Sequence, residues 1–193
     1  MERAKEVVGG KPIFQVLPYQ QKKIGLVTTG SEVYKGRIQD AFTPVIREKL
    51  AEYDMGIQMQ ELSGDDHKQI TEIIQSMVDA GMDMIICTGG MSVDPDDRTP
   101  LAIKNTGAEI VTYGAPVLPG AMFMLGYVKG EIPIAGLPGC VMYAKRTIFD
   151  LVLPRLLAGE KIEKEELDRL GEGGLCLNCQ ICTFPNCGFG KGV

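Results

Sequence analysis

The stretch "MDMIICTGGMSVDPDDRTP", residues 82–100, carries the pattern that decides the fold class. Its first half is a continuous apolar run, which is typical of a strand buried on both faces of a parallel sheet. The run ends in a Gly-Gly turn, and the Thr-Pro pair at 99–100 begins a helix, because proline fits the first helical turn, where its missing N–H costs nothing. A buried strand therefore passes through a glycine loop directly into a helix.

The same alternation of strand and helix continues along most of the chain. Strands are expected at 22–30, 56–62, 82–90 and 108–114, with a hairpin over 122–139 that turns at Lys129-Gly130. Helices are expected at 43–53, where Thr43 can cap, at 65–81, at 99–107 and at 140–159, where Pro154 should kink or end the helix. This order predicts an α/β fold: a three-layer sandwich with a mostly parallel sheet, plus a short Cys-rich C-terminal tail.

Length and composition narrow the function classes. A chain of 193 residues suits one domain with a sizeable core. Its net charge of −5 gives no electrostatic reason to expect nucleic acid or an anionic membrane as a partner. The N-terminus has no apolar signal region, so we expect a cytoplasmic, reducing location, where clustered cysteines indicate metal or redox chemistry rather than disulfides. The single His excludes a mechanism that needs several histidines.

The expected domain organisation has four parts. They are a connecting segment at 1–21, the α/β domain at 22–159, a charged linker with a short solvated helix at 160–175, and the Cys-rich tail at 176–193. The opening segment resembles an interdomain connection, so we expect the chain to be part of a longer protein.

Three loops are candidates for a ligand site, because open α/β sheets bind ligands beyond the carboxyl ends of their strands. The loops at 28–40 and 88–100 carry glycines and hydroxyls that suit phosphate, and 136–140 is a weaker candidate. Asp94, Asp96 and Asp97 crowd the second loop. Carboxylates beside phosphate-binding amides recruit Mg²⁺, a role we expect for Asp97, while Asp94 and Asp96 are equally compatible with a solvated loop.

Together these loops resemble the molybdopterin-binding domain shared by molybdopterin adenylyltransferases and molybdenum insertases of molybdenum-cofactor biosynthesis. The resemblance covers residues 22–158. The motifs that carry it are "TTGSEV", "GRIQDAFTP", "TGGMSVDPDDRTP", "GAPVLPGAMFMLG" and "IAGLPGCVMYA", in the order and spacing of the family.

The resemblance implies a set of site residues. Asp97 and Asp40 would be catalytic, with Asp97 holding Mg²⁺. The residues implied to bind the pterin and its phosphate are Thr29, Gly30, Ser31, Glu32, Gly89, Gly90, Ser92, Pro119, Gly120, Pro138 and Gly139. Molybdopterin is the implied ligand, with Mg²⁺ and ATP or AMP as partners of the reaction, and the family's domains form homo-oligomers.

The activity stays open between the two branches of the family. "DRTP" is more like the adenylyltransferases, and the later loops are more like the insertases. We therefore expect an enzyme of pterin adenylylation or molybdate insertion. Phe42, Leu118 and Cys140 depart from the family's pattern, which leaves a non-catalytic molybdopterin carrier or sensor as the alternative.

The tail spaces its cysteines as Cys176-x₂-Cys179-x₂-Cys182-x₄-Cys187. Four thiolates supply a complete metal shell, and the successive C-x₂-C steps resemble an iron–sulfur run, although zinc also remains possible. We expect a metal-binding appendage that the pterin chemistry does not require.

Overall fold

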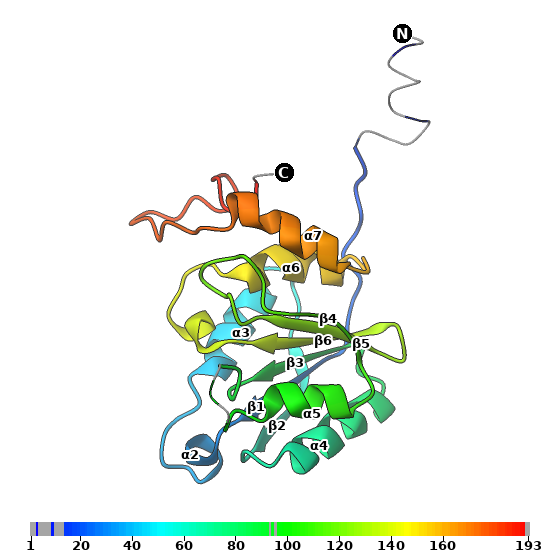
Figure 1. Cartoon of the computed structure of the whole chain (residues 1–193), viewed down its shortest axis with the longest axis vertical. Helices are drawn as coiled ribbons and strands as arrows, with labels where there is room; N and C mark the ends of the chain where they lie inside the picture. The colour runs from blue at the N-terminus through cyan, green and yellow to red at the C-terminus, as the bar shows by residue number, and fades with distance from the viewer. Residues whose placement is uncertain (1–2, 4–8, 10–13, 93, 95, 192–193) are drawn as a thin grey trace.

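The computed structural model describes residues 3, 9, 14–92, 94 and 96–191. At its centre lies a six-stranded sheet with the order β2-β1-β3-β6-β5-β4 (Figure 1). The strands are β1 (Ile24–Thr29), β2 (Ile57–Ser63), β3 (Met84–Thr88), β4 (Glu109–Tyr113), β5 (Met124–Val128) and β6 (Ile132–Leu137). β1, β2, β3 and β6 run parallel, while β5 is antiparallel to both β6 and β4, so the mostly parallel sheet is confirmed.

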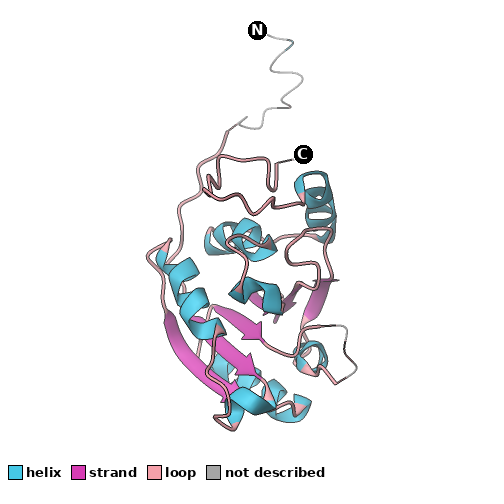
Figure 2. Cartoon of the chain, turned by 90° about the vertical axis from the view of Figure 1, so that its left-hand side faces the viewer, coloured by secondary structure: helices cyan, strands magenta, loops and turns pink. Residues whose placement is uncertain are grey.

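Helices cover both faces of this sheet, which gives three layers (Figures 1 and 2). The helical segments are α2 (Ser31–Tyr34), α3 (Phe42–Ala51), α4 (His67–Asp79), α5 (Thr99–Asn105), α6 (Ile148–Leu157) and α7 (Lys164–Arg169), with 3₁₀ turns η1 (Gly139–Met142) and η2 (Leu170–Gly173). The core contacts place α3, α6 and α7 on one face and α4 and α5 on the other. Within the described residues, every helix is too short or too polar to cross a bilayer.

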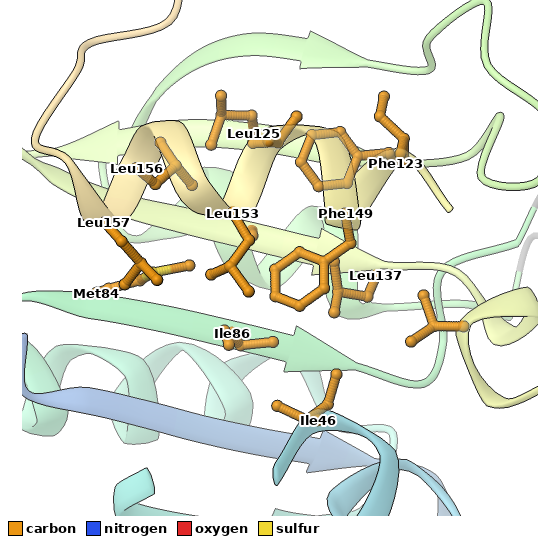
Figure 3. Close-up of a cluster of buried hydrophobic side chains, with 14 of the residues drawn as sticks. Ile46, Met84, Ile86, Phe123, Leu125, Leu137, Phe149, Leu153, Leu156 and Leu157 are labelled. Atoms are coloured by element: carbon orange, nitrogen blue, oxygen red, sulfur yellow. The ribbon is translucent and has the colours of Figure 1, made fainter. Parts of the chain in front are cut away.

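Two hydrophobic clusters lie on opposite sides of the central strands. Ile86 points into the larger cluster, beneath Phe149 and Leu153 of α6 (Figure 3), and Leu26 belongs to the same cluster. The next residues along these strands, Val27 and Cys87, join the smaller cluster under α4. Successive residues of a strand point to opposite faces, so β1 and β3 are apolar on both faces until the threonines at their carboxyl ends. This explains the continuous apolar runs in the sequence.

The expected hairpin is also confirmed. Lys129 and Gly130 both adopt positive φ, at 52° and 76°, between β5 and β6. Two consecutive residues with positive φ form the tight turn whose twist matches that of paired strands.

The single helix expected over 140–159 is wrong. The 3₁₀ turn η1 ends at Met142, and α6 begins only after Thr147, whose hydroxyl accepts a hydrogen bond from the Phe149 N–H. Asp150 completes a capping box by accepting from the Thr147 N–H at 2.7 Å. Pro154 does not end the helix either, since α6 continues to Leu157.

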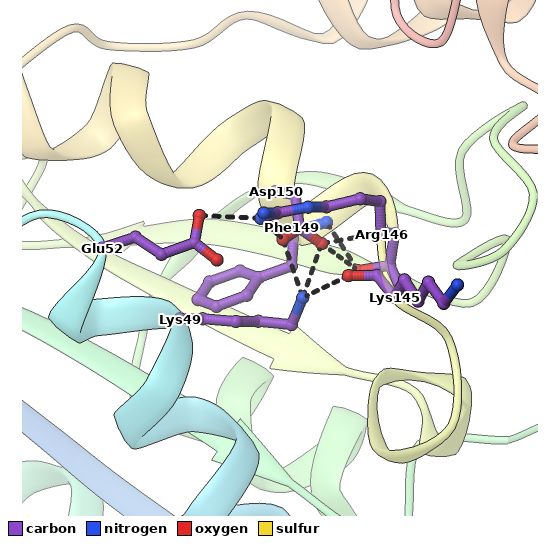
Figure 4. Close-up of polar contacts among 7 residues, drawn as sticks. Lys49, Glu52, Lys145, Arg146, Phe149 and Asp150 are labelled. Carbon is purple, nitrogen blue, oxygen red and sulfur yellow. Dashed lines mark hydrogen bonds and ion pairs between the residues drawn. The ribbon is translucent and has the colours of Figure 1, made fainter. Parts of the chain in front are cut away.

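A buried ionic network fixes the start of α6 against α3 (Figure 4). The Lys49 ammonium lies 2.7 Å from Asp150, and both side chains are almost completely buried. Arg146 joins Asp150 at 2.9 Å and Glu52, the residue after α3, at 2.8 Å. Hydrogen bonds to Glu52 and Asp150 outweigh the effect of burial and raise the pKa of Arg146. The segment before α6 is therefore held by charge pairs rather than by a continued helix.

The charged segment and the tail differ from the solvated linker and appendage that the sequence predicts. Ile162 and Leu167 are buried, and Phe189 of the tail belongs to the larger core cluster. Leu118 exchanges backbone hydrogen bonds with the tail, donating to Gly174 at 2.6 Å and accepting from Cys176 at 2.8 Å. The tail thus packs on the α/β domain.

Candidate functional site

The strand order predicts a ligand crevice between the carboxyl ends of β1 and β3, at the topological switch point of the sheet. The chain leaves β1 through α3 towards β2 on one side, and it leaves β3 through α5 towards the opposite side of the sheet. Neighbouring parallel strands whose connections diverge in this way open the usual ligand site of an α/β sheet. The loops after β1 and β3 are the two strongest candidates from the sequence, and the loop after β6 ends at the same edge.

Hydroxyls and a close backbone approach join the two sides of this crevice. The Thr29 hydroxyl lies 3.2 Å from the Thr88 carbonyl oxygen, to which it donates, and 2.9 Å from the Thr99 hydroxyl. Gly89 has φ +83°, and a Cβ there would overlap the Thr29 carbonyl oxygen. A Cβ on Gly90 would come within 2.9 Å of the Thr99 hydroxyl oxygen. Only glycine allows these loops to pack so closely.

Asp97 closes the loop that follows the Gly-Gly turn. Its Oδ2 accepts a 2.6 Å hydrogen bond from the Ser92 N–H, and its own N–H donates to the Asp94 carbonyl at 3.0 Å. Asp97 is partly exposed, and its Oδ1 accepts no hydrogen bond within the part of the chain that the structure describes. One carboxylate oxygen therefore shapes the loop while the other is available to a cation.

Tyr113 is a site residue that the sequence analysis does not identify. At the end of β4 its hydroxyl donates to the Ser92 carbonyl at 3.1 Å, so it holds the Asp97 loop from the far side. Burial, followed by the negative charge of Asp97, raises the pKa of Tyr113. Its place at a strand end before Gly114 is the only local signal, because the contact spans distant parts of the chain.

The carboxylate of Asp40 is held by hydrogen bonds within the protein. Its Oδ1 accepts from the N–H groups of Phe42 and Thr43 at 2.8 and 3.1 Å, and its Oδ2 accepts from the hydroxyls of Thr28 and Thr43. Asp40 rather than Thr43 therefore satisfies the first amides of α3, which corrects the capping role expected for Thr43. Both oxygens are engaged, and the catalytic role of Asp40 stays a prediction.

The remaining residues of the β1 loop lie at the outer edge of the crevice. Gly30 donates its N–H to the Ser63 carbonyl at 3.0 Å, and Ser31 donates its N–H to Asp65 at 3.0 Å. A Cβ on Gly30 would meet open space. Glu32, in α2, is exposed.

The two Pro-Gly pairs, Pro119-Gly120 and Pro138-Gly139, lie in different surroundings. Pro119 and Gly120 pack on the start of α6, where the Ile148 N–H donates to the Pro119 carbonyl at 3.2 Å. Gly120 lies so close that a Cβ would approach the Ile148 side chain to 2.6 Å. Pro138 is buried at the end of β6, whereas Gly139 is exposed. The structure thus brings together the Thr29, Gly89 and Asp97 loops, while Pro119 and Gly120 contact α6.

The four tail cysteines lie elsewhere, around a cavity of about 100 Å³ between the tail and the segment before α6. Cys176 and Cys187 are partly buried, and Cys179 and Cys182 are exposed. Across residues 14–92 and 96–191, no three His, Cys, Asp or Glu side chains converge closely enough to bind a single metal ion.

A family model described as a probable molybdopterin binding domain matches residues 25–158. A CinA-like protein of Mycobacterium avium is 33% identical over 90 residues, which is 46% of this chain but 21% of that protein. A CinA-like protein of Mycolicibacterium gilvum is 35% identical over 77 residues, 40% of this chain and 18% of that protein. The chain thus spans about a fifth of these curated relatives.

Solved structures share the fold at low sequence identity. MoaB of Thermus thermophilus, titled a molybdopterin biosynthesis enzyme, superposes with a TM-score of 0.56 at 23% identity, over 72% of this chain and 98% of that one. MoaB of Pyrococcus furiosus, titled a tungsten cofactor synthesizing protein, gives 0.57 at 19% identity, over 73% and 99%. CinA of Thermoplasma acidophilum, titled as of unknown function, gives 0.54 at 16%, over 70% and 96%.

Proposed function

Because the chain belongs to the molybdopterin-binding domain family, whose model matches residues 25–158, we propose that it binds molybdopterin in the crevice between β1 and β3 and acts in molybdenum-cofactor biosynthesis. The observation that supports this most strongly is the Gly89-Gly90 turn, packed against Thr29 and closed by the Ser92–Asp97 hydrogen bond. Such a turn presents backbone N–H groups to an anion without a side chain in the way. The pterin phosphate is the anion that we assign to it.

The proposed reaction is transfer of the adenylyl group from ATP to this phosphate. An oxygen of the pterin phosphate forms a bond to the α-phosphorus, the bond from that phosphorus to the bridging oxygen breaks, and pyrophosphate leaves. Phosphoryl chemistry of this kind depends mainly on positioning and on neutralising charge. This chain contributes the loop that orients the attacking oxygen and the Asp97 carboxylate.

Asp97 suits Mg²⁺ because its carboxylate is partly exposed and, within the described residues, only its Oδ2 accepts a hydrogen bond. Mg²⁺ is usually held by one or two carboxylates together with substrate phosphates rather than by a complete protein cage. Bound there, the ion would neutralise the phosphates of the nucleotide. Insertion of molybdate at the pterin dithiolene is the neighbouring possibility, since it would use the same pocket with the adenylylated pterin as substrate.

A non-catalytic carrier or sensor is the second candidate, and the environment of Asp40 favours it. Both oxygens of that carboxylate cap α3 or bind hydroxyls, so the second implied acidic residue is occupied within the protein. A carrier would retain the glycine turn and bind the pterin without turnover.

The test compares Asp97→Asn with Asp96→Asn in the purified full chain. Asparagine keeps an oxygen that accepts the Ser92 N–H bond, so Asp97→Asn removes charge with little change in loop shape. Asp96 is an exposed carboxylate of the same loop and serves as the control. We expect calorimetry to show molybdopterin binding by all three proteins. Formation of adenylylated pterin should fall about 100-fold or more in Asp97→Asn alone, as for other groups that stabilise transition-state charge.

Each other outcome has a defined meaning. Pterin binding without product in the wild type would replace the enzyme with the carrier. Failure of the wild type to bind either pterin or Mg-ATP would remove both candidates.

A further inference from the structure

We propose that the four tail cysteines bind an iron–sulfur cluster in a site built partly from the α/β domain, independently of the pterin function proposed above. The cavity that these thiols share, the domain residues that line it and the positive charge of those residues support this occupant.

The first observation is that Cys176, Cys179, Cys182 and Cys187 all line the same cavity of about 100 Å³. Asn178, between the first two, adopts a left-handed conformation at φ +49°, which asparagine tolerates. Four cysteines of a twelve-residue segment therefore border one cavity.

The second observation concerns the spacing of these thiols along the chain. Cys176, Cys179 and Cys182 follow one another in two successive C-x₂-C steps, and Cys187 comes five residues later. Successive steps of this kind are typical of iron–sulfur runs, whereas structural zinc sites usually pair two separated C-x₂-C units. The spacing therefore favours a cluster over a single zinc ion.

The third observation is that the domain itself completes the cavity. The Lys145 ammonium donates to the carbonyl oxygens of Cys179 and Gln180 at 3.1 and 3.0 Å, and Arg146 lies 4.8 Å from the centre of the Phe184 ring. Phe184 and Phe189 line the cavity from the tail. Arg146 is fixed in turn by Asp150 and Glu52 (Figure 4). The cysteine loop is thus attached to a rigid part of the fold.

The charges match an anionic occupant. A cluster ligated by four thiolates carries net negative charge, and Lys145 and Arg146 are the cationic side chains that line the cavity in the described structure. Cations and hydrogen bonds near a cluster are among the features that set its potential. The site also adjoins a second pocket, between α3 and residues 141–146, that Cys182 lines from the tail side. That segment includes the end of η1, which begins directly after Pro138 at the end of β6.

The experiment measures iron, acid-labile sulfide and zinc in the full chain after anaerobic purification and after reconstitution with ferrous iron and sulfide. Cys179→Ser and Cys182→Ser are compared with Cys140→Ser, because Cys140 is partly exposed but lies outside the cavity. We expect iron and sulfide in equal amounts in the wild type and in Cys140→Ser. Loss of one thiolate should lower iron content about tenfold or more, since even outer-shell changes cost that much in metal affinity.

Thermal unfolding of each variant provides the check on folding. A cluster that binds only the folded chain should raise the melting temperature of the reconstituted wild type, and not that of a folded Cys179→Ser protein. Zinc without sulfide would overturn the proposal in favour of a single ion. Neither metal after reconstitution, or equal iron in all variants, would also overturn it.

Discussion

Gly89→Ala should destabilise the protein in a way that separates backbone conformation from close packing. Gly89 has φ +83°, and Gly81, at the end of α4, has φ +79°. A Cβ on Gly81 meets nothing within 4 Å, whereas one on Gly89 overlaps the carbonyl oxygen of Thr29. The two alanine variants therefore share the conformational penalty and differ only in the overlap.

The magnitudes follow from these two terms. Alanine in a left-handed conformation costs about 1–2 kcal/mol, which is the whole effect expected for Gly81→Ala. Forcing a methyl group into a packed site adds about 1–3 kcal/mol. The obstructing atom is backbone of β1, where Thr29 pairs with Ser63 of β2, so it cannot rotate away freely. The free energy of unfolding should fall by about 2–5 kcal/mol in Gly89→Ala.

Urea denaturation of the two variants measures this difference, and molybdopterin titration measures its effect on the crevice. Gly89→Ala should also bind the pterin more weakly, since the loops after β1 and β3 must separate, whereas Gly81→Ala should bind as the wild type does. Equal losses of stability in the two variants would show that Gly89 is needed for its φ alone and that the close approach to Thr29 carries no energy.

Three further predictions concern the core and the loop clamp. Asp150→Asn should lower the free energy of unfolding by about 3–5 kcal/mol, because Lys49 stays buried without its charge partner. Asp168→Asn, in the exposed pair with Lys164, is the control in the same denaturation experiment and should cost under about 0.5 kcal/mol. Tyr113→Phe should weaken pterin binding in calorimetry by about 0.5–1.5 kcal/mol through loss of the bond to Ser92, while Tyr143→Phe, fully outside the site, should not. Burial raises the pKa of Tyr53 and of Cys87 to about 12, so the unfolded chain loses these two protons at lower pH than the folded chain does. Denaturant unfolding should therefore show the free energy of unfolding falling as the pH rises above about 9 towards 12. A constant free energy of unfolding over that range would contradict both pKa shifts.

The fold could be predicted because its signals are local. Each buried strand has a run of apolar residues, and the Lys129-Gly130 and Gly89-Gly90 pairs show in the sequence where the strands end. The sequence pattern does not predict the start of α6 correctly, although Thr147 and Asp150 have the spacing of a capping box. Residues 140–146 have a pattern that also fits a helix, so the cap at Thr147 is not evident from the sequence. In the structure Arg146 of this segment pairs instead with Glu52, just after α3.

The site was predictable only in part, for a related reason. Glycine turns and acidic residues are visible in the sequence, but which carboxylate is already occupied depends on tertiary contacts. Asp40 is engaged partly by Thr28, at the end of a different element, and Tyr113 reaches Ser92 from another strand. Neither contact follows from spacing along the chain.

The tail shows the same dependence, and Phe189 provides its test. If the tail did not pack on the domain, Phe189→Ala would change the free energy of unfolding as little as a substitution at the exposed Phe14. In the structure Phe189 is only 4% exposed and lies within the larger core cluster, whereas Phe14 is 90% exposed. Truncating a buried phenylalanine removes about 3–5 kcal/mol, although a site near the chain end can relax and should give the lower value.

Phe14→Ala should change stability by less than about 0.5 kcal/mol and is the matched control for urea denaturation. The measurement is best made on metal-free protein, because bound metal would add its own stabilisation to the tail. If both variants unfold like the wild type, the tail is not docked and the cavity between it and the domain does not form in the absence of metal. If only Phe189→Ala is destabilised, the tail is docked on the domain and the cysteine cavity forms before any metal arrives.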